Sequence, residues 1–143
     1  MSFTTTKNSI NHYSSVDNYT AVTDADPHQL VRMLLDGALK KISIVKGLMI
    51  RKDVAKKGEV IGQALSIIAG LRSSLDLTSG GELALNLDNL YEYIERRLLE
   101  ANLKNDIAIL DETSKLLHEI KTGWEAIPTE SKTRSGPNLS VAS

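Results

Sequence analysis

The chain has 143 residues and a mass of 15.7 kDa, enough for one sizeable hydrophobic core and too little for two ordinary domains. Its 17 lysine and arginine residues nearly balance 18 aspartate and glutamate residues without a long basic run, which argues against a nucleic-acid-binding protein. There is no cysteine, which excludes disulfides and thiolate sites, and no apolar run of about 18 residues, so we expect neither a signal peptide nor membrane insertion.

Residues 1–25 carry few apolar side chains, and we expect them to form a flexible leader. The first helix is predicted to begin at Pro27, because Asp26 suits the N-cap position and proline suits the first helical position. From Val31 to Met49 apolar residues recur at alternating spacings of four and three. That periodicity is typical of a bundle helix, which we expect to end near Ile50.

A second helix is predicted after a short connection in which Asp53 is the expected N-cap. Its apolar face runs from Val54 to Leu75. The stretch Leu77 to Gly81, LTSGG, is expected to end it, because glycine supplies the open backbone of a turn. Residues 79–82 also fit a capping box for the next helix, with Ser79 and Glu82 as the paired side chains.

The third helix is predicted to carry its apolar stripe from Leu83 to Ala101, and residues 104–106 break the chain. A fourth helix then runs to about Ile127, where Pro128 ends it. Residues 128–143 have almost no apolar side chains and are expected to form a disordered tail. Long helices joined by short loops predict an all-α fold, an antiparallel up-down four-helix bundle over residues 26–127 with a flexible leader and tail.

Catalytic and metal-binding motifs are not found in the sequence. Carboxylate-bridged metal bundles use Glu-x-x-His pairs, and none of His12, His28 and His118 has a glutamate three residues before it. No Gly-rich phosphate loop or GxSxG elbow is present. We therefore expect no enzyme activity, no cofactor and no metal, and a metal-dependent enzyme is a distant alternative.

The helices hold more large apolar side chains than one core-facing stripe needs, both in residues 30–50 and in the third helix. Exposed apolar surface on a protein usually marks a binding site, and grooves between helices accept amphipathic segments. Burial between three neighbouring helices, or a homodimer, would use the same surplus. In the third helix one row consists of Leu87, Tyr91, Ile94 and Leu98, and a flanking row consists of Leu83, Leu90, Tyr93 and the stem of Arg97.

The stretch from Asn86 to Asp106, NLDNLYEYIERRLLEANLKND, resembles the signature of the flagellar secretion chaperone FliS family. That signature has Leu-Tyr-x-Tyr, a pair of arginines, and Ala-Asn followed by a restart of the chain. The resemblance extends to ADPHQLVRMLLDGALKK in the first helix, to the turn at residues 80–82 and to Trp124. It covers about residues 19–127, nearly the whole part of the chain that we expect to be ordered.

This resemblance implies a cytoplasmic, non-enzymatic export chaperone. Its client would be the C-terminal segment of flagellin, which is disordered in the monomer and would lie in hydrophobic grooves of the bundle. The chaperone would prevent premature polymerisation and assist delivery to the flagellar type III export apparatus. An export gate component and a co-chaperone or regulator are further partners that the resemblance suggests. The alternative is a self-associating structural bundle, such as a homodimer, that uses the same apolar surface.

The family signature and the helical phase together give the candidate site residues. Tyr91 and Tyr93 point to roughly opposite faces, and we place Tyr93 at the client groove and Tyr91 nearer the core. The family's tyrosine-containing leader, which covers a hydrophobic pocket, suggests Tyr13 or Tyr19 as an N-terminal cap. The candidate partner-binding residues are Leu34, Leu35, Leu83, Leu90, Tyr91, Tyr93, Arg96, Arg97, Ala101 and Asn102.

Overall fold

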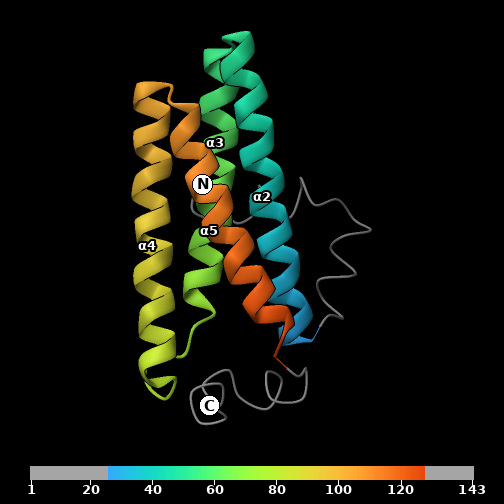
Figure 1. The fold of residues 1–143 in the computed structure, drawn as a ribbon, viewed down its shortest axis with the longest axis vertical. Helices are drawn as coiled ribbons and strands as arrows, with labels where there is room; N and C mark the ends of the chain where they lie inside the picture. Colours follow the sequence, from blue (N-terminus) through green and yellow to red (C-terminus); the bar gives the residue numbers. More distant parts are fainter. Residues whose placement is uncertain (1–25, 128–143) are drawn as a thin grey trace, which may run out of the picture.

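A computed structural model of the protein describes residues 26–127, and in that part of the chain it has four helices and no strand. Each helix runs antiparallel to the one before it, so the predicted up-down-up-down bundle is confirmed (Figure 1). The predicted leader with Tyr13 and Tyr19, and the predicted tail, lie outside the described residues. The helices are α2 (Pro27–Arg51), α3 (Val54–Ser73), α4 (Gly81–Lys104) and α5 (Ile107–Glu125).

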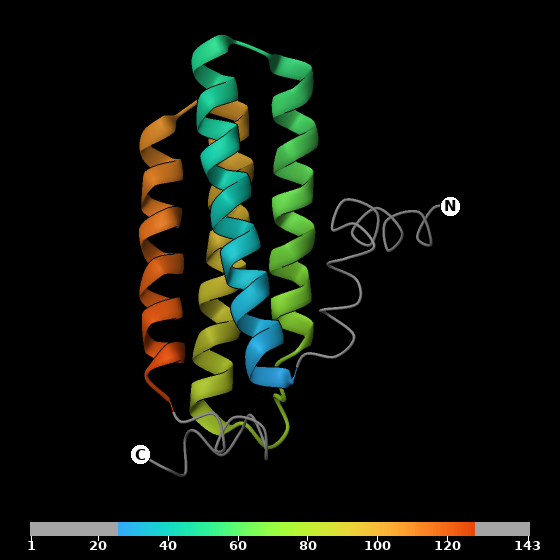
Figure 2. The ribbon, with the colours of Figure 1, turned by 90° about the vertical axis from the view of Figure 1, so that its right-hand side faces the viewer.

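The four helices pack around one core. The main contacts join α2 to α3 and α5, and join α4 to the same two helices, so each helix has two close neighbours (Figure 2). The core is mainly aliphatic, with Tyr91 as its buried aromatic residue, and full burial of one aliphatic side chain stabilises the fold by about 1.5–3 kcal/mol. None of the helices α2–α5 is long and apolar enough to cross a membrane. The completely buried core residues include Leu35, Ile42, Ile68, Ile94 and Leu110.

Aspartate side chains start three of the four helices. The Oδ1 atoms of Asp26 and Asp53 each accept a hydrogen bond from the backbone amide three residues later, at 2.7 and 3.2 Å. Asp106 accepts from the amide two residues later at 2.9 Å. Such caps are each worth about 1 kcal/mol, and the predicted caps at Asp26 and Asp53 are confirmed. Lys52 and Asn105, with φ of 62° and 52°, end α2 and α4 in the left-handed conformation.

The connection between α3 and α4 differs from the prediction. α3 ends at Ser73, so Leu75 lies beyond the helix rather than inside it. The predicted capping box of Ser79 and Glu82 is wrong, because the N-cap of α4 is Gly80, which has no side chain to donate or accept. α5 ends at Glu125, two residues before the predicted end, which is within the usual scatter of helix boundaries.

Asp76 organises the turn in place of the predicted box. Its Oδ2 atom accepts a hydrogen bond from the Ser79 hydroxyl at 2.5 Å, and its Oδ1 atom accepts hydrogen bonds from the backbone amides of Thr78 and Ser79, both at 3.1 Å. A side chain at Gly80 would put its Cβ 2.3 Å from the Asp76 carbonyl oxygen and 2.4 Å from the Ala84 Cβ, so only glycine fits there. The turn therefore holds α4 close to the end of α3.

Candidate partner-binding site

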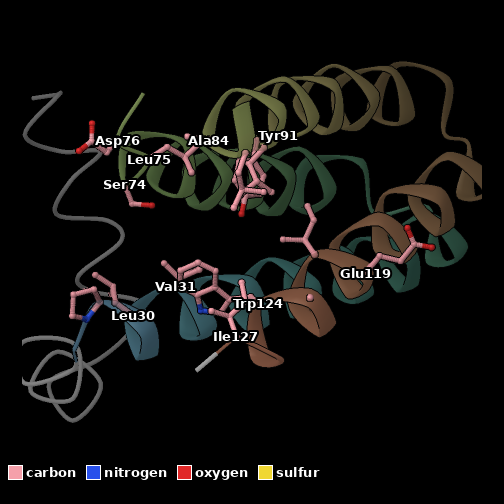
Figure 3. A pocket seen from close by; sticks show the side chains of 15 residues that line it. Leu30, Val31, Ser74, Leu75, Asp76, Ala84, Tyr91, Glu119, Trp124 and Ile127 are labelled. Carbon is pink, nitrogen blue, oxygen red and sulfur yellow. The ribbon is translucent and has the colours of Figure 1, made fainter. Parts of the chain in front are cut away.

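An apolar cavity lies at the end of the bundle where α2 and α4 begin and α3 and α5 end. We call it the end cavity. Figure 3 shows Leu75, Ala84 and Tyr91 on one side of it, and Leu30, Val31 and Trp124 on the other. Its volume is about 360 Å³, within the range of about 300–1,000 Å³ typical of ligand pockets. The full lining is Pro27, Leu30, Val31, Ser74, Leu75, Asp76, Leu83, Ala84, Leu87, Tyr91, Glu119, Ile120, Gly123, Trp124 and Ile127.

Two small residues help to explain the open space at this end. Ala84 and Gly123 both line the end cavity, and neither has a side chain that could fill it. A Cβ atom built on Gly123 would meet no heavy atom within 4 Å. Close packing excludes large voids from most protein interiors, so an apolar space that no side chain of residues 26–127 fills is an unusual feature of this end of the bundle.

Trp124 forms a fixed wall of the end cavity. Its indole Nε1 donates a hydrogen bond of 3.1 Å to the backbone carbonyl of His28, and the two rings stack with centroids 5.8 Å apart and planes 17° apart. These contacts hold the only tryptophan of the chain against the start of α2. The ring is half-buried and remains partly accessible from the cavity. Trp124 is therefore an accessible apolar wall of the end cavity and a spectroscopic reporter for it.

The lining offers little chemistry beyond apolar contact. Its two carboxylates are Asp76, which is engaged in the turn before α4, and Glu119, which is exposed at the rim. Within residues 26–127 no group of three or more histidine, cysteine or acidic side chains is placed to hold a metal ion. The end cavity suits the aliphatic or aromatic side chains of a partner far better than a polar reactant.

Tyr91 and Tyr93 have different environments, as the helical phase predicts. Tyr91 is only 2% exposed, packs in the core and forms part of the end cavity, and burial raises the pKa of its hydroxyl. Tyr93 is half-buried between α4 and α5, where its hydroxyl donates to Glu112 Oε2 at 2.6 Å. This bond raises the pKa of Tyr93 and lowers the pKa of Glu112. The placement of Tyr91 near the core is confirmed, whereas contact of Tyr93 with a client stays a prediction.

The paired arginines extend the network around Tyr93. Arg97 donates from Nε to Glu112 Oε1 at 2.8 Å and also contacts Glu100 on its own helix. The guanidinium of Arg96 lies over the Tyr93 ring, 5.5 Å from its centroid. Exposed ion pairs of this kind contribute little individually, but together they join α4 to α5. None of Tyr93, Arg96 and Arg97 lines the end cavity.

The remaining candidate residues fall into three environments. Leu83 lines the end cavity together with Tyr91. Leu34 and Leu90 are half-buried against the core, and Leu35 and Ala101 are 0% exposed within it. The Asn102 carbonyl accepts a hydrogen bond from the Lys57 ammonium at 3.1 Å. A fully buried side chain can contact a partner only if the bundle opens. In the described conformation Leu35 and Ala101 therefore contribute to core packing and offer no surface to a partner.

Most of the lining was not among the candidate residues. The missed positions come from all four helix ends, whereas eight of the ten candidate partner-binding residues lie on α4. The sequence did contain one indication of this cavity. Large apolar residues are found in the first turn of α2, at Leu30, and beyond the end of α5, at Ile127. The most prominent missed residues are Leu30, Val31, Leu87, Ile120, Trp124 and Ile127.

Comparison with known proteins places this bundle among flagellar proteins. Residues 9–131 match the model of the family described as flagellar protein FliS. The chain is 49% identical over 115 residues to flagellar secretion chaperone FliSB of Pseudomonas aeruginosa, with 80% of this chain and 91% of that protein covered. It is 42% identical over 123 residues to flagellar secretion chaperone FliS of Salmonella typhimurium, covering 85% and 91%. The corresponding chaperone of Vibrio cholerae is 38% identical over 124 residues, covering 87% and 91%.

Proposed function

Because this chain belongs to the FliS family, in which its relatives are named flagellar secretion chaperones, we propose that it is a cytoplasmic, non-enzymatic export chaperone for flagellin. It would bind the disordered C-terminal segment of flagellin and so prevent premature polymerisation. It would then assist delivery of the client to the flagellar type III export apparatus, where an export gate component and a co-chaperone or regulator are further partners.

The observation that supports this proposal most directly is the end cavity. It is an open space of about 360 Å³ whose lining is mainly apolar and has two carboxylates, Asp76 and Glu119. A disordered amphipathic segment that folds on binding needs apolar pockets for its anchor side chains, and grooves between helices commonly supply them. A client side chain in the end cavity would lie against Leu87, Tyr91 and Trp124.

The end cavity alone is too small for tight binding of a disordered client. Full burial of one leucine contributes about 1.5–3 kcal/mol, and micromolar affinity needs about 8 kcal/mol after the segment has been ordered. The client therefore has to contact further surface along the bundle. The half-buried side chains of Leu34, Leu90 and Tyr93 are suitable for this, which keeps them in the proposed client path.

Fluorescence of Trp124 tests the proposal, because no other tryptophan contributes to the emission. Titration with a tryptophan-free peptide from the C-terminus of flagellin should shift the emission to shorter wavelength and saturate near one peptide per chain. A scrambled peptide of the same composition is the control and should cause no shift. Binding of the native peptide without any change in emission would exclude the end cavity as its site.

A second copy of this chain is the alternative occupant of the end cavity. Mass measured as a function of protein concentration separates the two cases. If the chain forms a dimer that the flagellin peptide cannot dissociate, the apolar surface serves self-association instead of the client.

A further inference from the structure

We propose that the end of the bundle opposite the end cavity is a second docking surface, which accepts an acidic, partly apolar segment of another protein. This surface consists of the α2–α3 turn and the α4–α5 turn, which lie together at the top of Figure 1. We call it the basic tip. Its members are Ile50, Arg51, Lys52, Val54, Lys56, Leu103 and Lys104.

Large apolar side chains gather at the basic tip. Ile50, Val54 and Leu103 are 70%, 68% and 83% exposed, and they are the most exposed large hydrophobic residues in the described part of the chain. A single exposed leucine on a protein surface needs no explanation. Ile50 lies in the last turn of α2, Val54 begins α3 and Leu103 lies in the last turn of α4, so three large apolar side chains stand exposed at one end of the bundle, with no covering element among residues 26–127.

Basic side chains surround these apolar ones. Arg51 ends α2, Lys52 lies in the α2–α3 turn, Lys56 is in the first turn of α3 and Lys104 ends α4, and all four are exposed. Within residues 26–127 neither Arg51 nor Lys52 forms an ion pair. The basic tip therefore has positive charge available for an acidic partner.

The acidic groups at this end are already engaged. The Asp53 and Asp106 carboxylates cap the starts of α3 and α5. Glu59 pairs with Lys56 at 3.5 Å, and Glu100 accepts from both Arg97 and Lys104. These four carboxylates keep their negative charge. Six cations lie at the same end, which are Arg51, Lys52, Lys56, Lys104, Arg97 and the buried Lys57, so the balance there is positive.

The opposite end of the bundle is acidic. Asp76, Glu82 and Glu119 lie near the end cavity, in the turn before α4, in the first turn of α4 and in the last part of α5. An acidic segment is therefore steered toward the basic tip and away from the end cavity. α2 has 25 residues and spans about 37 Å at 1.5 Å per residue, so the two ends can be occupied together.

Hydrogen bonds join the two parts of the basic tip. The Lys57 ammonium, whose side chain is buried, donates to the Asn102 carbonyl at 3.1 Å and to the Asn105 Oδ1 at 2.5 Å. This links the first turn of α3 to the last turn of α4. The two helix ends are therefore held together before a partner binds, so binding need not order them relative to each other.

A protein segment fits this surface better than a membrane does. Stable attachment to a bilayer requires a long amphipathic helix or a lipid chain combined with a polybasic patch. The basic tip has only three apolar side chains and four cations, and the whole chain has a net charge of −1. We therefore assign the surface to an acidic protein segment with apolar residues, and binding to anionic lipid is an outcome that the test must separate.

The test uses amide NMR of the full-length chain, titrated with a synthetic helical peptide that has glutamate on one face and leucine on the other. We expect shifts confined to residues 50–57 and 102–106, with an affinity that falls as salt is raised. The double substitution Arg51→Glu with Lys52→Glu should weaken binding at least about ten-fold, as should Ile50→Ser with Val54→Ser. The matched control is Lys40→Glu with Lys115→Glu, which makes the same charge change on exposed helix surface and should leave binding unchanged.

Three outcomes would overturn the proposal. They are no shifts at millimolar peptide, shifts that spread over the bundle with an equal loss in the control variant, or binding to phosphatidylglycerol vesicles that exceeds binding to the peptide. The flagellin peptide is titrated in parallel and should bind the Arg51→Glu and Lys52→Glu variant as it binds the unaltered chain. Failure of the basic tip is therefore distinguishable from failure of the proposed chaperone function.

Discussion

Replacement of Gly123 by leucine is expected to stabilise the bundle and, at the same time, to weaken binding of a flagellin C-terminal peptide at least about ten-fold. Gly123 lies in α5 and lines the end cavity, and a Cβ atom at this position meets nothing within 4 Å. A leucine would occupy space that the client needs. Removing a helical glycine should also raise the free energy of unfolding by up to about 0.5–1 kcal/mol.

The opposite signs of these two effects make the result difficult to explain by misfolding. Urea unfolding gives the stability and titration of the peptide gives the affinity. Gly62→Leu is the matched control, since Gly62 is exposed on α3, has equal room for a side chain and does not line the end cavity. It should stabilise the bundle without any change in affinity. An unchanged affinity in Gly123→Leu would mean that the client does not enter the end cavity.

Leu35→Ala is expected to lower the free energy of unfolding by about 2–5 kcal/mol, because it leaves a cavity in a packed core. Leu35 is 0% exposed on α2 and packs among buried residues of the core cluster. For a domain of this size each kcal/mol lowers the melting temperature by roughly 4–8 °C. Thermal unfolding followed by circular dichroism measures the change.

Leu99→Ala is the control for Leu35→Ala, because it makes the same chemical change at a position on α4 that is 53% exposed. Its stability should remain within about 0.5 kcal/mol of the original. The pair also tests the assignment of Leu35 from sequence. If Leu35→Ala lost affinity for the flagellin peptide with hardly any loss of stability, the side chain would contact the client directly and its place in the core would be wrong.

The helices were predictable because local signals for them agree along the chain. All three prolines lie at or outside the ends of one block, and Asp26 and Asp53 lie where the first free amides of α2 and α3 need an acceptor. The spacing of apolar residues then gives the buried face of each helix. Short connections leave antiparallel neighbours as the simplest arrangement, so the bundle follows from the same information.

The turn before α4 shows where local patterns compete. Ser79 and Glu82 have the spacing of a capping box, but Asp76 can accept the same hydroxyl and the preceding amides. Gly81, with φ of 63°, and Gly80, which has no room for a side chain, favour the second arrangement. Both the capping box and the Asp76 turn use Ser79, and sequence spacing alone does not show which of the two forms.

The end cavity could not be predicted from one segment because its lining comes from both ends of the bundle sequence. Pro27 and Ile127 are a hundred residues apart and both line it. Helical phase separated Tyr91 from Tyr93 correctly, since the rings lie on different faces. It did not show that Glu112 of α5 would accept a hydrogen bond from the Tyr93 hydroxyl. Helical phase gives the side of the helix on which a residue lies, but it does not identify the residue of the neighbouring helix that it contacts.

Titration calorimetry of the full-length chain with a C-terminal flagellin peptide tests the central claim most directly, with a scrambled peptide of equal composition as the control. We expect sub-micromolar binding of about one peptide per chain with a negative heat-capacity change, because apolar side chains of the client become buried. Absence of heat at several temperatures would contradict the account if the peptide also failed to displace a fluorescently labelled copy of itself from the chain. The bundle would then keep its fold but lose flagellin as its client.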